Sequence, residues 1–202
     1  MHRPDVGRRL AAAAALVCLA LPAAVFAQGA SQQAVVETSA GSFVIDLDPA
    51  AAPNHVAAFI KTATDGGYDG TTFHRVVRNG MVQGGDPLSK DPSKRAQYGT
   101  GGLNTLKAEA RAEKMTRGSV AAVLVPGRPD SAGAQFFIVL ADQPSLGGQY
   151  TVFGHVSDGM EALMALSQTP VDAAGLATER AEITKLTTSQ TASTKASSHR
   201  GA

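Results

Sequence analysis

The stretch that most constrains the fold is FHRVVRNGMVQGGD, at residues 73–86. Two mainly apolar runs flank residues 78–80, and this order of strand, turn signal and strand is typical of a tight β-hairpin. The runs nevertheless contain His74, Arg75 and Gln83, which are unusual inside a sheet. On this stretch alone two interpretations of Arg75 stay open. It belongs to a functional site, or it pairs with a surface carboxylate.

The length of the hairpin loop decides which side chains share a face, because a slip of one residue turns every side chain to the other face. A two-residue loop and a three-residue loop both fit residues 78–80. We favour the three-residue loop, since Gly80 can adopt the positive φ that the end of such a loop needs. This register pairs Arg75 with Gln83 and predicts that both share one face with Met81.

The first 27 residues have the layout of a secretory signal peptide. Arginines precede an unbroken apolar run at residues 10–21, and Val25 and Ala27 are small residues at −3 and −1 of a cut after Ala27. The run is short for a membrane span, so we expect an exported, most simply periplasmic protein without a stable membrane anchor. The single cysteine, Cys18, lies in this segment, and no intramolecular disulfide is possible.

The balance of charge argues against two classes of partner. The formal net charge of +1 indicates neither a nucleic acid nor an anionic membrane surface. It becomes −1 without residues 1–27, which contain three arginines and Asp5.

The remaining chain is predicted to form short strands and two helices. Besides the hairpin, we expect strands at residues 34–37, 42–47, 118–125, 135–140, 150–156 and 180–186, and helices from Pro53 to about residue 65 and at about 160–167. Pro53 suits the first turn of a helix. His55 is expected to be exposed rather than a metal ligand, because no Cys or second His stands at metal-binding spacing.

Three regions complete the organisation of the chain. Residues 28–33 are a polar lead-in, residues 34–186 are one domain, and the Ser/Thr-rich residues 187–202 are expected to be a disordered tail. The aperiodic segment at residues 87–117 is expected to wrap over the surface. Many short strands with only two helices predict a mainly β domain, an antiparallel barrel with helices at its open ends.

Four motifs in consistent order point to a known family. They are YDGTTFHRVVRNGMVQGGDP, GTGG at residues 99–102, SAGAQFFIVL, and LGGQYTVFGHVSDGM. Together they resemble the cyclophilin-type peptidyl-prolyl cis-trans isomerases from about residue 34 to residue 186, and the signal peptide indicates an exported bacterial-type member. The resemblance implies a closed eight-stranded antiparallel barrel capped by two helices. It also implies an isomerase (rotamase) that acts on proline-containing polypeptides in protein folding, without a cofactor or a metal. We expect the protein to be a monomer.

The resemblance further implies the residues of the site. Arg75 takes the position of the family's catalytic arginine. The positions that bind substrate are His74, Met81, Gln83, Val123, Leu124, Gln135, Phe137, Leu146 and Tyr150. Met81, Phe137 and Leu146 would form walls of the proline pocket, and Val123 and Leu124 would offer backbone groups to the peptide. Gly80 stands where many members carry a pocket Phe.

These residue types suit a reaction that makes and breaks no covalent bond. The barrier to rotation is the lost amide resonance, ~18–20 kcal/mol. A guanidinium beside the nitrogen can donate a hydrogen bond to the lone pair that returns as the C–N bond twists, and this bond is stronger in the transition state. Ser131 has neither a nearby His nor a nucleophile elbow, which argues against a serine hydrolase. The alternative hypothesis is a peptide-binding chaperone or scaffold with weak isomerase activity, which Gly80 favours because the pocket would be shallower.

Overall fold

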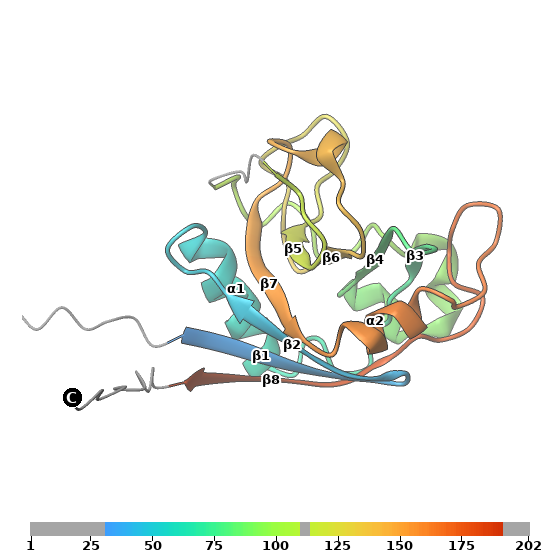
Figure 1. The fold of residues 1–202 in the computed structure, drawn as a ribbon. Coiled ribbons are helices and arrows are strands. Elements are labelled where there is room, and N and C mark those ends of the chain that lie inside the picture. The colour runs from blue at the N-terminus through green and yellow to red at the C-terminus, as the bar shows by residue number, and fades with distance from the viewer. Residues whose placement is uncertain (1–30, 110–113, 192–202) are drawn as a thin grey trace, which may run out of the picture.

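The structure is a computed structural model that describes residues 31–109 and 114–191 (Figure 1). The predicted signal peptide and the end of the predicted tail lie outside the described residues. Within them the chain forms eight strands, two α-helices and three short 3-10 helices. Every predicted strand and both predicted helices are confirmed, with bounds that differ by a few residues.

The bounds of the elements are as follows. The strands are β1 (Ser31–Thr38), β2 (Gly41–Leu47), β3 (Arg75–Val77), β4 (Met81–Gly84), β5 (Ser119–Ala122), β6 (Phe136–Val139), β7 (Val152–Asp158) and β8 (Ile183–Thr191). The α-helices are α1 (Pro53–Thr64) and α2 (Met160–Leu166), and the 3-10 helices are η1 (Pro87–Lys90), η2 (Pro92–Gln97) and η3 (Pro144–Leu146).

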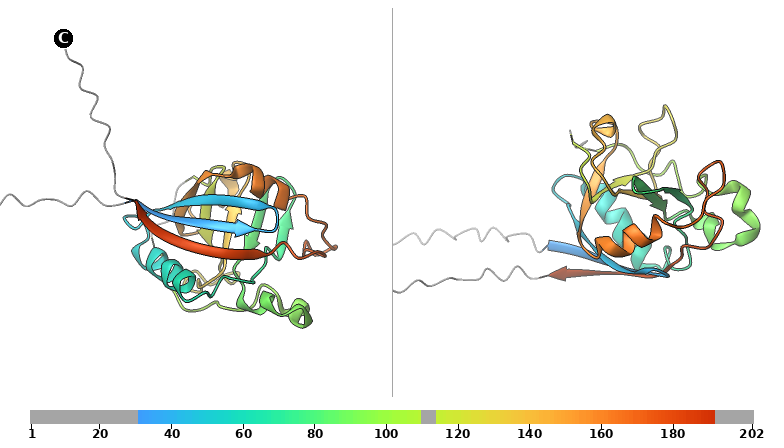
Figure 2. Two further views of the ribbon diagram at one scale, coloured as in Figure 1. Left: turned by 90° about the horizontal axis from the view of Figure 1, so that it is seen from below. Right: turned by 45° about the vertical axis from the view of Figure 1, so that its right-hand side comes forward.

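All eight strands belong to one antiparallel sheet in the order β3-β4-β6-β5-β7-β2-β1-β8. The mainly β class is therefore confirmed. The prediction of a closed barrel is wrong, because the sheet keeps two edges, β3 and β8, and curls into an open half-barrel (Figures 1 and 2).

The two edges approach each other without forming a ladder. Isolated bridges link the segments beside them: Thr72, before β3, pairs with Glu182, before β8, and Arg75 pairs with Leu176 of the preceding loop. The strand β3 has only three residues, and its free side bonds to the loop at residues 175–177 rather than to β8. Because a ladder needs a run of alternating hydrogen bonds along both strands, this short edge leaves the sheet open.

The two helices lie on opposite sides of the β1–β2–β8 face, as the left view of Figure 2 shows. Helix α1 packs against β8 and β7, and α2 packs against β2. Pro53 occupies the first turn of α1 as predicted. Val56, Phe59 and Ala63 recur at helical spacing and are buried, so one apolar stripe of α1 covers the sheet.

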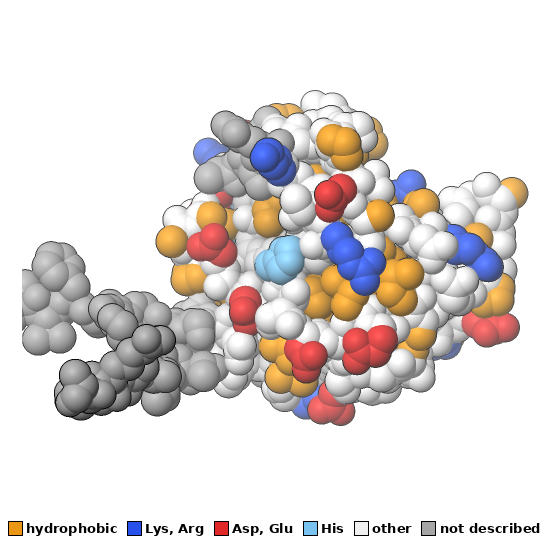
Figure 3. Space-filling model, viewed as in Figure 1, with side chains coloured by type: hydrophobic (Ala, Val, Ile, Leu, Met, Phe, Trp, Pro, Cys, Tyr) orange, Lys and Arg blue, Asp and Glu red, His pale blue; other side chains and the backbone are white. Residues whose placement is uncertain are grey.

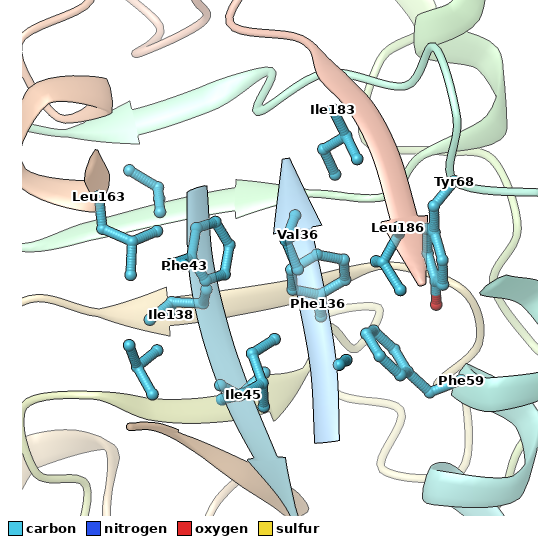
Figure 4. Close-up of a cluster of buried hydrophobic side chains, with 14 of the residues drawn as sticks. Val36, Phe43, Ile45, Phe59, Tyr68, Phe136, Ile138, Leu163, Ile183 and Leu186 are labelled. Carbon is cyan, nitrogen blue, oxygen red and sulfur yellow. The ribbon is translucent and has the colours of Figure 1, made fainter. Parts of the chain in front are cut away.

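The core forms on both faces of β6. Side chains alternate along a strand, so Phe136 and Ile138 enter the main core with Phe43 and Leu163 (Figure 4). Phe137 and Val139 point to the other face and join a second, smaller cluster with Met115 and Ala121. Because β6 is buried on both faces, the second cluster gives the outer face of the sheet a firm apolar floor.

The two terminal strands are longer than predicted. Strand β1 begins at Ser31, inside the predicted lead-in, and β8 continues to Thr191, inside the predicted tail. The pairs Val35–Thr187 and Ser31–Thr191 bound a continuous ladder. The prediction of a tail from residue 187 was wrong here because the edge of β1 offers hydrogen bonds to a segment that lacks large apolar residues.

His55 is buried, which corrects the prediction that it is exposed. Its imidazole and its backbone N–H bind the carboxylate of Glu109, which also accepts from the backbone and the side chain of Asn54. Burial by itself would raise the pKa of Glu109, but these hydrogen bonds outweigh it and lower the pKa to about 2. Glu109 therefore caps the first turn of α1 from a distant loop.

The face shown in Figure 3 carries acidic and basic side chains interspersed with hydrophobic ones, without a continuous patch of one sign. This distribution agrees with the small net charge. Among the described residues, no helix is both long enough and apolar enough to cross a bilayer.

Candidate active site

The hairpin of β3 and β4 has the three-residue loop that the sequence favoured. Arg75 pairs with Gln83 and Val77 with Met81. The reason was partly wrong, because the residue with positive φ is Asn79, at 56°, and not Gly80. Asn tolerates this left-handed conformation better than other side chains do. The register therefore holds, and it turns Arg75, Met81 and Gln83 toward one hollow.

This hollow has a volume of about 310 Å³. We call it the proline hollow, after the pocket that the resemblance in sequence implies. Its lining consists of Arg75, Met81, Gln83, Val123, Leu124, Pro126, Phe137, Leu146 and Tyr150. Eight of these residues are among the predicted site residues. Sequence reasoning missed Pro126, whose signal is the Pro-Gly-Arg-Pro turn that directly follows the predicted backbone contacts. His74 and Gln135 do not line the hollow but lie buried behind it.

The apolar half of the hollow rests on the second cluster. Phe137 is 3% exposed and meets the ring of Tyr150 edge to face, with ring centroids 5.0 Å apart. Met81, from β4, and Leu146, from η3, pack against the same cluster. A rigid aromatic floor with flexible apolar walls suits a small saturated ring.

The polar half is a chain of side-chain hydrogen bonds. Arg75 donates from Nη1 to Gln83 Oε1 at 3.4 Å, and Gln83 Nε2 donates to Gln135 Oε1 at 3.1 Å. Gln135 Nε2 in turn donates to the carbonyl of Gly101 at 2.7 Å. Since each amide both donates and accepts, the backbone at Gly101 fixes the direction in which Gln83 faces Arg75.

The glycine-rich loop at residues 99–102 is held by the buried carboxylate of Asp86. Asp86 accepts from the N–H groups of Gly99 at 2.5 Å, Gly101 at 3.3 Å and Leu88 at 2.8 Å. A side chain at Gly101 would place Cβ 2.3 Å from an Asp86 oxygen, so only glycine allows this approach. The loop therefore supports Gln135 through the Gly101 carbonyl, and its backbone N–H groups bind the Asp86 carboxylate.

His74 lies directly behind Gln83. Its Nε2 is 3.4 Å from Gln83 Nε2, and its ring meets Tyr98 edge to face. Burial lowers the pKa of His74, although the Asp86 carboxylate partly opposes this shift. The imidazole is thus neutral at neutral pH and accepts from Gln83, which makes it a support of the site rather than a wall.

The backbone groups near Val123 and Leu124 differ in availability. The Val123 N–H already donates to the carbonyl of Gln135 at 3.1 Å. No hydrogen bond within the described part of the chain uses the backbone of Leu124. Leu124 can therefore bind the backbone of an extended peptide through both its N–H and its carbonyl, and Val123 only through its carbonyl.

This arrangement can grip an apolar ring and donate hydrogen bonds to a neighbouring amide. Arg75 is the only charged side chain in the lining, and the lining contains no Ser, Thr or Cys. Over residues 31–109 and 114–191, no three His, Cys, Asp or Glu side chains gather closely enough to hold a metal ion. The groups that the lining offers to a ligand are one guanidinium, one side-chain amide, one phenol and an apolar surface.

The chain matches known proteins over the whole described domain. The family described as cyclophilin type peptidyl-prolyl cis-trans isomerase/CLD matches residues 34–188. A probable peptidyl-prolyl cis-trans isomerase of Brucella suis is 39% identical over 163 residues, which cover 77% of this chain and 83% of the relative. The Arabidopsis thaliana peptidyl-prolyl cis-trans isomerase CYP18-2 is 33% identical over 145 residues, which cover 72% of this chain and 86% of the relative.

Solved structures show the same fold. A cyclophilin type peptidyl-prolyl cis-trans isomerase from Cryptosporidium parvum, determined in the presence of the dipeptide Ala-Pro, has a TM-score of 0.69 at 27% identity and covers 77% of this chain and 97% of its own. The residues that match the family include both strands of the hairpin and every residue that lines the proline hollow.

Proposed function

The chain belongs to the cyclophilin-type peptidyl-prolyl cis-trans isomerases, and we propose that Arg75 catalyses rotation about an X–Pro bond held on Phe137. The observation that carries this assignment is the meeting of one guanidinium with an apolar floor in a single hollow, at positions that lie far apart in the chain. The substrates are proline-containing polypeptides. This substrate class is supported by the Ala-Pro dipeptide used with the Cryptosporidium structure.

The proline ring is recognised by the apolar half of the hollow. Phe137 supports one face of the ring, and Met81 and Leu146 enclose it. Burying these surfaces supplies binding that does not depend on the rotational state of the bond. It anchors the ring while the residue before it turns.

Arg75 supplies the part of binding that favours the transition state. As the C–N bond twists, amide resonance is lost and the nitrogen regains a lone pair. A guanidinium N–H that donates to this nitrogen binds the twisted amide more strongly than the planar one, which lowers the barrier. The second arm of the guanidinium can hold the proline carbonyl.

Gln83 and Gln135 position this guanidinium. The hydrogen-bond chain from Gly101 through both glutamines ends on Arg75. Since a fixed donor costs no reorganisation when the barrier is crossed, the order of this chain contributes to catalysis although neither amide acts on the twisting bond.

The setting of the reaction follows from the sequence. The signal-like residues 1–27 support an exported, periplasmic protein. We expect it to act as a monomer on exported or folding chains. We expect no cofactor, because rotation about the X–Pro bond needs no electron or group transfer.

The test of the proposal is the Arg75→Ala substitution. Isomerisation of a proline peptide, measured by NMR exchange, should fall by about 10²–10³-fold in kcat/KM. Arg75→Lys keeps the charge without the planar fork and should also lose most of the activity. Arg78→Ala is the matched control, because Arg78 is exposed and lies outside the hollow.

Stability separates catalysis from folding in this test. Arg75 is exposed and makes one long hydrogen bond, so the thermal midpoint of Arg75→Ala should stay close to that of the native protein. A native rate in Arg75→Ala would overturn the assignment of the site.

The alternative is a peptide-binding chaperone or scaffold with weak isomerase activity. It is favoured by one observation, that no aromatic side chain of the hairpin lines the proline hollow. Assays of aggregation and of isomerisation with the wild-type protein decide between the isomerase and the chaperone. Suppression of aggregation of an unfolded chain without measurable isomerisation of proline peptides would support the chaperone.

A further inference from the structure

A second hollow adjoins the proline hollow. It has a volume of about 530 Å³ and is lined by residues 124–129 and 148–150. Leu124, Pro126 and Tyr150 line both hollows. A peptide whose proline occupies the first hollow therefore needs to pass only these three side chains to reach the second.

The second hollow has one charged side chain, Arg128. Its guanidinium has no ion pair or hydrogen bond among the described residues. The backbone around it is nevertheless fixed, because the Arg128 N–H donates to Val125 O at 2.9 Å and Ser131 Oγ donates to Arg128 O at 2.6 Å. An ordered turn thus presents an unpaired cation at the wall of the hollow.

The walls leave room for a side chain. Gly127 and Gly148 have φ values of 74° and 72°, and a Cβ added at either would have no neighbour within 4 Å. Beside them, the unused backbone of Leu124 can bind a peptide in extended form. An extended chain advances by roughly 3.3 Å per residue, so a side chain within a few residues of the proline reaches this space.

We propose that the second hollow is a subsite for an acidic side chain that precedes the proline of the substrate. The proposal rests on the function assigned to the proline hollow. Arg75, which holds the proline carbonyl there, does not line the second hollow. The segment after the proline leaves beside Arg75, and the segment before it passes Leu124 toward Arg128.

The experiment uses short peptides with a single proline and with Glu, Gln or Lys at each of the three positions before it. A second set carries the same changes after the proline. NMR exchange gives kcat/KM without a coupled protease, which would impose its own specificity. The wild-type protein should prefer Glu over Gln by about two- to five-fold at one position before the proline, the range of an exposed ion pair.

Variants of Arg128 identify the source of the preference. Arg128→Gln should bring the ratio of kcat/KM for the Glu peptide to kcat/KM for the Gln peptide to about one. Arg128→Glu should have its highest kcat/KM with the Lys peptide. Arg78→Gln is the control, because Arg78 is another exposed arginine without an ion pair in the described residues, and it lines neither hollow. It should keep the wild-type ratio. High salt should weaken the preference in the wild-type protein.

Two outcomes would overturn the subsite. In the first, the ratio of kcat/KM for Glu and Gln peptides is the same in the wild-type protein and in Arg128→Gln. In the second, the wild-type protein prefers Glu only at positions after the proline. Equal turnover of an uncharged peptide by both proteins would leave the isomerase function intact in either case. If no peptide is isomerised, the proposed function fails, and the ratio of Kd values of the same peptides still decides on the subsite.

Discussion

Arg75 suits its role because a guanidinium remains charged throughout the pH range in which proteins are folded. The histidine behind the hollow, His74, has a pKa lowered by burial from an ordinary value of 6.5. Above that value the imidazole is neutral in the folded and the unfolded chain alike. Neither group therefore changes its charge in weakly alkaline solution.

We predict that kcat/KM for a neutral proline peptide varies by less than about two-fold between about pH 7 and pH 9. The measurement is a pH profile by NMR exchange, with thermal midpoints recorded at each pH. A sigmoidal change centred near neutral pH would show that a titrating group takes part, contrary to a mechanism by Arg75 alone.

Asn79 is the residue on which the register of the hairpin depends. Its φ of 56° strains side chains that branch at Cβ, whereas glycine adopts this conformation freely. Asn79→Val should lower the free energy of unfolding by about 1–2 kcal/mol. Asn79→Gly should change it little, since the loss of the hydrogen bond from Gln168 to Asn79 Oδ1 at 3.1 Å is offset by relief of strain. Urea unfolding of both variants tests this, and equal losses would contradict the role of φ.

At the scale of elements, α1 depends on a carboxylate outside it. Glu109 accepts hydrogen bonds from the N–H groups of Asn54 and His55, which lie in the first turn and have no partner within the helix. Its pKa falls from 4.5 to about 2 in the folded protein. A carboxyl group with a lowered folded pKa stabilises the fold above its unfolded pKa, and this contribution is lost as the pH falls from 4.5 toward about 2.

Glu109→Gln should therefore lower the free energy of unfolding by about 1–3 kcal/mol at neutral pH, because the donors of Asn54 and of the buried His55 lose a charged acceptor. The difference from the native protein should shrink as the pH falls toward 2. Asp65→Asn at the other end of α1 is the control, since its pair with Lys61 is exposed and should contribute less than about 1 kcal/mol. A pH-independent difference for Glu109→Gln would contradict the charge of Glu109 as the cause.

At the scale of the whole molecule, the two ends of the described chain pair with each other at one edge of the sheet. Strand β8 pairs with β1 along the whole length of β1, and α1 packs on β8. The five residues 187–191 hold the outer half of this ladder. They are polar, and their contribution comes from backbone hydrogen bonds to β1 rather than from burial of apolar surface.

Two truncations test this role. A chain that ends at Thr191 should keep the thermal midpoint of the full chain, whereas a chain that ends at Leu186 should unfold several degrees lower, because β1 then becomes an open edge from Ser31 to Val35. Equal midpoints for the two truncations would show that residues 187–191 add nothing to the fold.

The sequence by itself determined the local elements and the family. The loop at residues 78–80 predicted the pairing of Arg75 with Gln83, and the apolar run at residues 135–140 predicted a strand, and the structure confirms both. The motifs placed eight of the nine residues that line the proline hollow. Such features can be predicted because backbone geometry alone sets which side chains share a face.

Only the tertiary structure decided the contacts between distant segments. The capping of α1 joins His55 to a residue 54 positions away, and no local pattern marks either partner. The open edge beside β3 depends on how a loop of another region packs against three residues. The second hollow exists because the turn at Arg128 and the loop at Gly148 face each other. These contacts arise from the packing of the whole chain, which fixes relative positions that periodicity and turn chemistry leave free.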